Sequence, residues 1–341
     1  MRRDYALFRY PGDKEDCYLV EADSSCTVTA NGMDEIAGRT GFVFAPFEVS
    51  KTLPLILIPG EKRPVNNIPE METAKHNGVG EVTEDRGQYA SDYRTFHEAI
   101  SCGKVDKAVL ARSSKLEISE IQESSSLFKK ACRLYPNSFV ALIDTATTGT
   151  WLMATPEVLL EEVNGRWHTM ALAGTMTERE TEKNDWSEKN MAEQRYVAVY
   201  IRKILKRFAD DISEVGPITV KAGCVSHLKT DFLFDIKKDV IPCSLVSALH
   251  PTPAVCGLPK EPALALIRES EHLDRKYYSG FCGFIGDNGD FRLYVTLRCM
   301  NLCGNKAELY AGGGIMADSR EEDEWAETRR KMNAMRDVLG I

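Results

Sequence analysis

A tight turn signal near the middle of the chain limits the folds that the chain can adopt. The dipeptide Asn164-Gly165 separates two short segments of high strand propensity, at 158–162 and 169–172. Asn-Gly favours the two-residue turn whose twist matches paired antiparallel strands, so these segments are predicted to form a β-hairpin. Helical patterns occur on both sides of it, at 126–134 and 186–208. Hairpins mixed with helices, without strict strand–helix alternation, predict an α+β fold built on antiparallel sheet.

Similar patterns continue along the chain. Strands are predicted at 27–30, 41–44, 53–58, 107–112, 139–143, 150–153, 281–285, 291–297 and 307–311, and further helices at 91–101, 263–271 and 320–339. Residues 60–87 are polar, contain glycine and proline and lack periodicity, so they are predicted to form a long mobile loop. We therefore expect an N-terminal β-rich part at 1–90, followed by a larger core at 91–341.

Charge and cysteine content favour a small-molecule protein. The chain has 43 basic and 51 acidic residues and a net charge of −8, so no basic excess suggests binding to nucleic acid or to an anionic membrane. No apolar run reaches the roughly 20 residues of a membrane span, and Met1-Arg2-Arg3 is not followed by the apolar stretch of a secretory signal. The ten cysteines include no Cys-x-x-Cys pair. These features predict a cytoplasmic protein without a zinc site or a disulfide framework.

Two carboxylates at helical spacing are candidates for holding a metal ion. Glu324 and Glu327 are three residues apart in the last predicted helix, so they share a face. Glu193, in the helix predicted at 186–208, could add a third oxygen ligand and complete a magnesium site. Surface helices are also rich in glutamate, and Glu327 with Lys331 has the spacing of an ordinary i, i+4 ion pair. Spacing alone leaves both interpretations open.

An anion could be held by a glycine run and an arginine nearby. Gly312-Gly313-Gly314 follows a predicted strand, so a bend is expected there, at which backbone N–H groups could approach an anion. Arg298, at the end of another strand, could bind a carboxylate with its planar guanidinium. A plain turn and a structural ion pair are the respective alternatives.

Four further residues could take part in chemistry. Lys107 begins an apolar strand, where loss of water would favour the neutral amine of a general base. Glu157 follows Thr155-Pro156, and its burial would keep a carboxylic acid protonated. A solvated lysine and a turn carboxylate are the alternatives. His227 and His250 lack metal-ligand spacing, so each is a structural histidine or a donor to a ligand.

Taken together, the motifs resemble the chorismate-utilising enzymes, the family of isochorismate, salicylate, anthranilate and aminodeoxychorismate synthases. The resemblance runs from about residue 93 to the C-terminal end, with the motifs in the family's order. They are Lys107 to Arg112, Thr155-Pro156-Glu157, Leu172 to Thr175, the helix of Glu193, His227-Leu228, the block at His250, Val295 to Arg298, and Tyr310 to Glu327. It implies a single domain of two facing, mainly antiparallel sheets with helices outside and the active site in the cleft.

The resemblance also implies roles for individual residues. Mg²⁺ would bridge Glu193, Glu324 and Glu327 to the ring carboxylate of chorismate. Lys107 would deprotonate the water that attacks C2, and Glu157 would protonate the departing C4 hydroxyl. The residues implied to line the substrate site are Gly174, Thr175, His227, Tyr278, Arg298, Gly312, Gly313, Gly314 and Lys331.

Two positions indicate the branch of the family. Lys107 stands where the water-using enzymes have a lysine and anthranilate synthases typically have glutamine, while Ala173 replaces the nucleophilic lysine of many aminodeoxychorismate synthases. The chain therefore looks like an isochorismate synthase, a monomer or weak dimer, with menaquinone synthesis preferred over siderophore synthesis. A salicylate synthase and a non-catalytic chorismate-binding module are the alternatives. Met176, Gln194 and Cys256 depart from the family's usual arginine, histidine and glycine.

Overall fold

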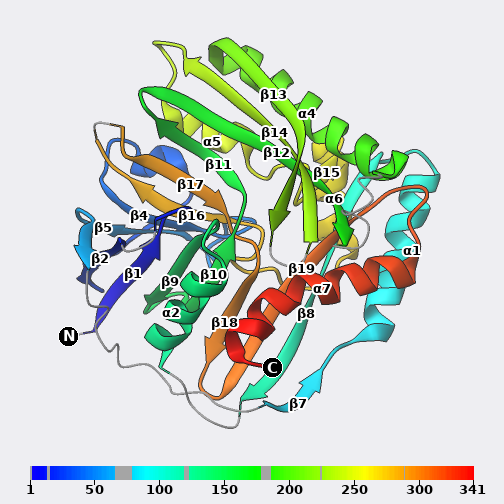
Figure 1. Ribbon diagram of the computed structural model, residues 1–341, viewed down its shortest axis with the longest axis horizontal. Helices are drawn as coiled ribbons and strands as arrows, with labels where there is room; N and C mark the ends of the chain where they lie inside the picture. The colour runs from blue at the N-terminus through cyan, green and yellow to red at the C-terminus, as the bar shows by residue number, and fades with distance from the viewer. Residues whose placement is uncertain are drawn as a thin grey trace.

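Two antiparallel β-sheets face each other and carry helices on their outer sides (Figure 1). The computed structural model describes residues 2–13, 16–65, 79–118, 123–177, 186–222, 225–287 and 289–341. Its two-sheet architecture confirms the α+β fold that the sequence and the family resemblance predict. None of the helices in these ranges combines the length and the apolar character required to cross a bilayer.

In the described residues the first sheet has ten strands, in the order β15-β8-β19-β18-β10-β9-β1-β2-β6, with β7 paired to β8. Their bounds are β1 Arg3–Arg9, β2 Cys17–Asp23, β6 Arg63–Val65, β7 Val79–Thr83, β8 Lys107–Ile118, β9 Phe139–Thr145, β10 Gly149–Thr155, β15 Gly257–Leu258, β18 Cys299–Cys303 and β19 Lys306–Ile315. The long pairing of β8 with β19 brings Lys107 and the glycine run of β19 into adjacent strands.

The second sheet has nine described strands, in the order β13-β14-β12-β11-β17-β16-β4-β5-β3. Their bounds are β3 Val28–Ala30, β4 Gly41–Ala45, β5 Leu55–Pro59, β11 Val158–Val163, β12 Arg166–Thr177, β13 Ala209–Ala222, β14 Val225–Ile236, β16 Phe281–Ile285 and β17 Phe291–Val295. The first 65 residues contribute strands to both sheets, so this part of the chain is built into the same two-sheet unit as the rest.

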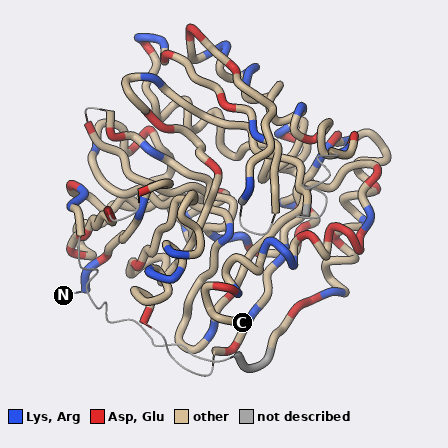
Figure 2. Tube along the Cα trace, viewed as in Figure 1, with Lys and Arg blue, Asp and Glu red and all other residues tan. Residues whose placement is uncertain are grey.

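Helices cover the outer faces of both sheets. The bounds are α1 Arg86–Ser101, α2 Ser124–Leu134, α4 Glu188–Phe208, α5 Pro242–Leu249, α6 Lys260–Ser270 and α7 Glu321–Leu339, with a short 3-10 helix at Met33–Ile36. α2 and α7 pack on the first sheet through residues such as Phe128 and Met332. α4 packs on the second sheet through Val197 and Ile201. Figure 2 shows acidic and basic positions interspersed along these elements, with the acidic first turn of α7 standing out.

The space between the sheets is filled mainly by aromatic side chains. Phe139 of the first sheet stacks on Tyr294 of the second, with ring centroids 4.1 Å apart and an interplanar angle of 4°. Phe8 contacts Phe42 and Phe284 across the same gap, with centroids 5.1 and 6.4 Å apart. Such buried rings bring a large apolar area out of water and fix the distance between the sheets.

The predicted hairpin is confirmed. Val163 pairs with Arg166 across the turn, and Asn164 and Gly165 adopt φ angles of 52° and 77°. These left-handed values are accessible to glycine and tolerated by asparagine, which is why this dipeptide forms the turn.

Several elements were not predicted. Nothing in the sequence analysis assigned strands to 209–236, where β13 and β14 form, or predicted α5 and β18. β13 is an exposed edge strand with two irregularities in its pairing, so it lacks the apolar alternation by which strands are recognised.

The prediction of a continuous loop at 60–87 is wrong for part of that range, because β6, β7 and the start of α1 occupy it. Residues 66–78 of this predicted loop lie outside the described residues.

A buried ion pair ties α6 to the first sheet. The guanidinium of Arg275 donates to both carboxylate oxygens of Glu271, at 2.5 and 2.7 Å, and to the carbonyl oxygens of Val109 and Val255. The Glu271 carboxylate also accepts from the backbone N–H of Ala111 in β8. The two side chains are 3% and 1% exposed, so removing one partner would leave the other charged and buried.

We expect Arg275→Met to lower the free energy of unfolding by about 3 kcal/mol. The matched control is Arg268→Met, which removes an ion pair to Glu48 whose side chains are 53% and 42% exposed, and should change stability by less than about 1 kcal/mol. Denaturant unfolding followed by circular dichroism measures both. Equal effects of the two substitutions would show that the buried pair has no special stabilising role.

Candidate active site

A cleft between the sheets brings most of the predicted site residues together. Its lining comes from β8, β12, β14, β19, α4 and α7, and from the segments before β11, β15, β16 and β18. Its lining includes ten of the predicted residues, namely Glu157, Gly174, Thr175, Glu193, His227, Tyr278, Arg298, Gly312, Gly314 and Lys331. The cavity is narrow, about 50 Å³, so a ligand larger than a few water molecules requires lining side chains to move. Of the other four, Lys107 pairs with Glu193 and Glu327 with Lys331. Gly313 lies between two lining glycines, and Glu324 lies beside Gly313.

Lys107 is completely buried at the start of β8. Its Nζ lies 2.8 Å from Oε1 of Glu193, an ion pair that lacks hydrogen-bond geometry among the described residues. The aliphatic part of Lys107 lies next to Gly314, because a Cβ placed on that glycine would be 2.7 Å from Lys107 Cε. A buried amine beside the cleft is therefore in position to act on a molecule held there.

Glu157 lines the cleft just before β11 and is 2% exposed. Burial raises the pKa of Glu157 to about 7, although the positive charges of Lys107 and Arg298 act in the opposite direction. A backbone hydrogen bond from the Val295 N–H to the Glu157 carbonyl oxygen, 3.0 Å long, fixes its position before β11. At neutral pH this carboxyl group is divided between its acid and ionised forms, as a proton donor requires.

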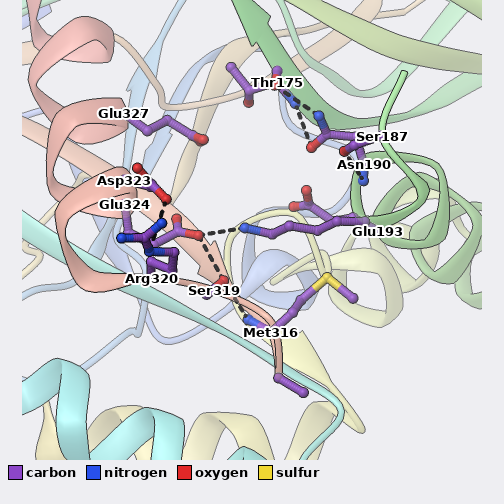
Figure 3. Close-up of polar contacts among 12 residues, drawn as sticks. Thr175, Ser187, Asn190, Glu193, Met316, Ser319, Arg320, Asp323, Glu324 and Glu327 are labelled. Carbon is purple, nitrogen blue, oxygen red and sulfur yellow. Dashed lines mark hydrogen bonds and ion pairs between the residues drawn. The ribbon is translucent and has the colours of Figure 1, made fainter. Parts of the chain in front are cut away.

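Three carboxylates from two helices face a common space. Figure 3 shows Glu193 of α4 opposite Glu324 and Glu327 of α7. Burial, and next the charge of Glu327, raise the pKa of Glu324. Burial would also raise the pKa of Glu327, but the ammonium of Lys331 outweighs it and lowers that pKa to about 2. Carboxylate oxygens are the ligands that Mg²⁺ prefers in proteins.

Each of these carboxylates is paired with a lysine. Glu193 pairs with Lys107, Glu324 with Lys189 and Glu327 with Lys331, at 2.8, 2.7 and 2.6 Å. In the described part of the chain no three acidic, histidine or cysteine side chains already stand at metal-binding spacing. The donor set fits a hard divalent cation in kind and number, and binding one requires the ammonium groups to give way.

The glycine run makes room for these side chains. A Cβ on Gly313 would lie 2.7 Å from Oε2 of Glu324, and one on Gly314 would lie 2.7 Å from Oε1 of Glu193. The predicted bend at this run is wrong, because Gly312 to Gly314 continue β19 and pair with Ala111 to Val109 of β8. The absence of side chains lets the carboxylates approach the strand closely, which residue spacing alone did not indicate.

We expect Gly314→Ala to lower turnover by about 10²-fold, because its new methyl group would displace both Glu193 and Lys107. The control is Gly32→Ala, at a position with extended backbone and no atom within 4 Å of the new Cβ. Turnover of the two variants should be measured beside their melting temperatures. A Gly314→Ala protein that keeps normal turnover would show that this close approach is not needed.

A chain of hydrogen bonds runs from Gly174 to Arg298. Burial, followed by the positive charges of Arg298 and Lys331, lowers the pKa of His227 to about 3, so its imidazole is neutral. Its Nδ1 donates to the carbonyl oxygen of Gly174 at 2.8 Å, which leaves Nε2 to accept from the guanidinium of Arg298 at 3.2 Å. His227 thereby orients Arg298 in the cleft. Arg298 itself follows the end of β17, which stops at Val295, two residues earlier than the predicted strand.

Other predicted residues complete the cleft walls. Lys331 donates from Nζ to the carbonyl oxygen of Gly312 at 2.9 Å. Thr175 is held at α4 by the side-chain amide of Asn190, which donates to its carbonyl oxygen at 3.1 Å. Burial raises the pKa of Tyr278 to about 12, so its hydroxyl stays protonated.

Two site residues of α4 were not predicted, and the role of one histidine was open. Lys189 and Asn190 lie four and three residues before Glu193, and that helical spacing was the available signal. His250 is partly buried, donates from Nε2 to the carbonyl oxygen of Phe47 at 3.0 Å and does not line the cleft, which favours its structural interpretation.

Comparison with known proteins relates the chain to a family and to solved structures. A family described as chorismate binding enzyme matches residues 61–340. The chain is 30% identical over 247 residues to isochorismate synthase EntC of Escherichia coli, covering 70% of this chain and 63% of that protein. It is 31% identical over 270 residues to isochorismate synthase MenF of Bacillus subtilis, covering 75% of this chain and 56% of that protein. The match thus spans less than two thirds of either relative.

The fold has a solved counterpart as well. The structure of MenF, the menaquinone-specific isochorismate synthase from Escherichia coli, superposes with a TM-score of 0.82 at 20% identity, covering 98% of this chain and 88% of that one. At this identity the likeness establishes the fold only.

Proposed function

The chain belongs to the chorismate-binding enzyme family, and from this premise we propose that it is an isochorismate synthase. The observation that carries the proposal is the pair of buried groups at one cleft, Lys107 and the partly protonated Glu157. A protein that only bound chorismate would have no chemical need for a buried base and a buried acid together. The names of the relatives support the same reaction.

In the proposed reaction one water molecule enters and another leaves. Lys107 takes a proton from water as its oxygen bonds to C2 of chorismate. The ring double bonds shift, the bond from C4 to its hydroxyl breaks, and Glu157 protonates the departing oxygen. Afterwards Lys107 gives one proton to solvent and Glu157 takes one from it, so both residues return to their starting states. Because one water is added and one is lost, the product is an isomer of the substrate.

The remaining residues would hold the substrate's two carboxylates. Glu193, Glu324 and Glu327 would hold Mg²⁺, which supplies positive charge to neutralise the ring carboxylate. Arg298, oriented by neutral His227, would pair with the enolpyruvyl carboxylate. Lys331 and the backbone near Gly312 lie beside this part of the cleft.

The test is to incubate the purified protein with chorismate and Mg²⁺, with EDTA in a parallel sample, and to separate the products by chromatography. Isochorismate without pyruvate is expected, with loss of turnover in EDTA. Salicylate with equimolar pyruvate would indicate a salicylate synthase. Measurable chorismate binding without any metal-dependent product would leave only a binding module.

We further propose that the isochorismate is used for menaquinone synthesis. Expression of the chain in a bacterium that lacks its own menaquinone-specific isochorismate synthase should restore menaquinone, measured in lipid extracts. Failure to restore menaquinone, together with normal isochorismate formation in vitro, would favour a siderophore pathway.

A further inference from the structure

We propose that Lys189 is an internal counter-ion of the metal site. In the metal-free protein its ammonium group supplies the positive charge that a bound metal would supply, and its displacement lowers the affinity for the divalent cation. This inference rests on the proposed function, because it presupposes that Glu193, Glu324 and Glu327 hold the metal. It concerns a residue that takes no part in the proton transfers.

Lys189 reaches from α4 to the carboxylate of α7. Its Nζ donates to Oε1 of Glu324 at 2.7 Å, and the same oxygen accepts from the hydroxyl of Ser319 at 2.7 Å. The side chain of Glu324 is 3% exposed, so little water is available to replace these partners. Besides Glu324, whose oxygen is 2.7 Å away, the carboxylates of Glu327 and Glu193 also act on the charge of this ammonium group. One ammonium group thus lies in the field of all three carboxylates.

Exposure distinguishes Lys189 from the other two paired lysines. The side chain of Lys107 is completely buried and that of Lys331 is 12% exposed, whereas that of Lys189 is 25% exposed. Lys331 also donates to the Gly312 carbonyl oxygen, which holds it in the cleft wall. Lys189 is therefore the lysine that can most readily move into water when a metal ion binds.

Coulomb's law makes the ammonium and a metal ion competitors. A cation bound through Oε1 of Glu324 would compete for the lone pairs that Lys189 and Ser319 now use. A cation bound through Oε2 would still lie a few ångströms from the ammonium group, and two positive charges so close repel strongly in a buried site. Metal binding must then displace Lys189 toward solvent, so the measured metal affinity includes the loss of its ion pair. In the metal-free protein the same pair stabilises a buried carboxylate.

This role predicts opposite effects on stability and on metal affinity. Lys189→Met should lower the melting temperature of the metal-free protein, because Glu324 loses its counter-ion. The same variant should bind Mn²⁺ with about tenfold lower Kd than the wild type. A lysine with a purely structural role would lower the melting temperature but would not tighten metal binding.

The experiment measures Mn²⁺ binding by electron paramagnetic resonance and melting temperatures with and without Mn²⁺, on the full chain. Lys189→Arg keeps the charge and should stay within about twofold of the wild-type Kd. The matched control is Lys62→Met, which removes a lysine 20% exposed and paired with Asp290, among residues that do not line the cleft. It should leave Mn²⁺ affinity unchanged.

Two results would overturn the proposal in distinguishable ways. If the wild type binds Mn²⁺, Glu324→Gln abolishes binding and Lys189→Met binds no tighter than the wild type, the metal site stands and the counter-ion role is wrong. If neither the wild type nor Lys189→Met binds Mn²⁺, the metal site of the proposed function fails, and the role of Lys189 fails with it.

Discussion

Replacing Lys107 by methionine is expected to lower the turnover of chorismate by about 10²- to 10⁴-fold, the range over which general bases contribute to enzyme rates. Methionine fills a similar volume, so the buried position keeps its packing and loses the amine. Chorismate binding should change far less, because the proposed contacts of its carboxylates come from Arg298, Lys331 and the metal site. Steady-state kinetics and calorimetric binding of chorismate separate the two quantities.

Lys115→Met is the matched control for this substitution. Lys115 lies on the same strand, β8, but its side chain is 67% exposed, so its removal should leave turnover near that of the wild type. A Lys107→Met protein with near-normal turnover would remove this lysine from the mechanism. Loss of Mn²⁺ binding in the same variant would instead indicate that its pairing with Glu193 organises the metal site.

Glu157→Gln is expected to cause a comparable loss, again about 10³-fold, because an amide cannot give a proton to the leaving hydroxyl. Only the protonated carboxyl group is active in this step, and the pKa of Glu157 is about 7. Wild-type kcat/KM should therefore fall by about tenfold per pH unit on the alkaline side of its profile, once Lys107 is fully in its base form. Kinetics across the alkaline range test this slope.

The control for this second substitution lies on the following strand. Glu162→Gln, near the other end of β11, changes a partly exposed carboxylate outside the cleft and should leave both the turnover and the pH profile unchanged. A wild-type pH profile without any fall on its alkaline side would contradict a donor role for Glu157. A Glu157→Gln variant that retains high turnover would exclude it outright.

Local sequence signals were sufficient for much of the fold. The Asn164-Gly165 turn, the helix bearing Glu324 and Glu327 and the apolar strand beginning at Lys107 are each encoded by neighbouring residues, and the structure contains all three. Local signals failed where an element's pattern depends on what packs against it. β13 is an exposed edge strand without apolar alternation, and Gly312 to Gly314 resemble a turn until the pairing with β8 is known.

The sequence by itself determined the residue types of the site, their order and the family, because motif identity and helical spacing are properties of the chain alone. Only the tertiary structure decided how these residues meet: that each metal-candidate carboxylate has its own lysine, that Lys189 belongs to the site, and that Gly313 and Gly314 make room for carboxylates. The physical reason is that burial and ion pairing depend on distances between α4, α7, β8 and β19, which residue spacing within one element does not encode.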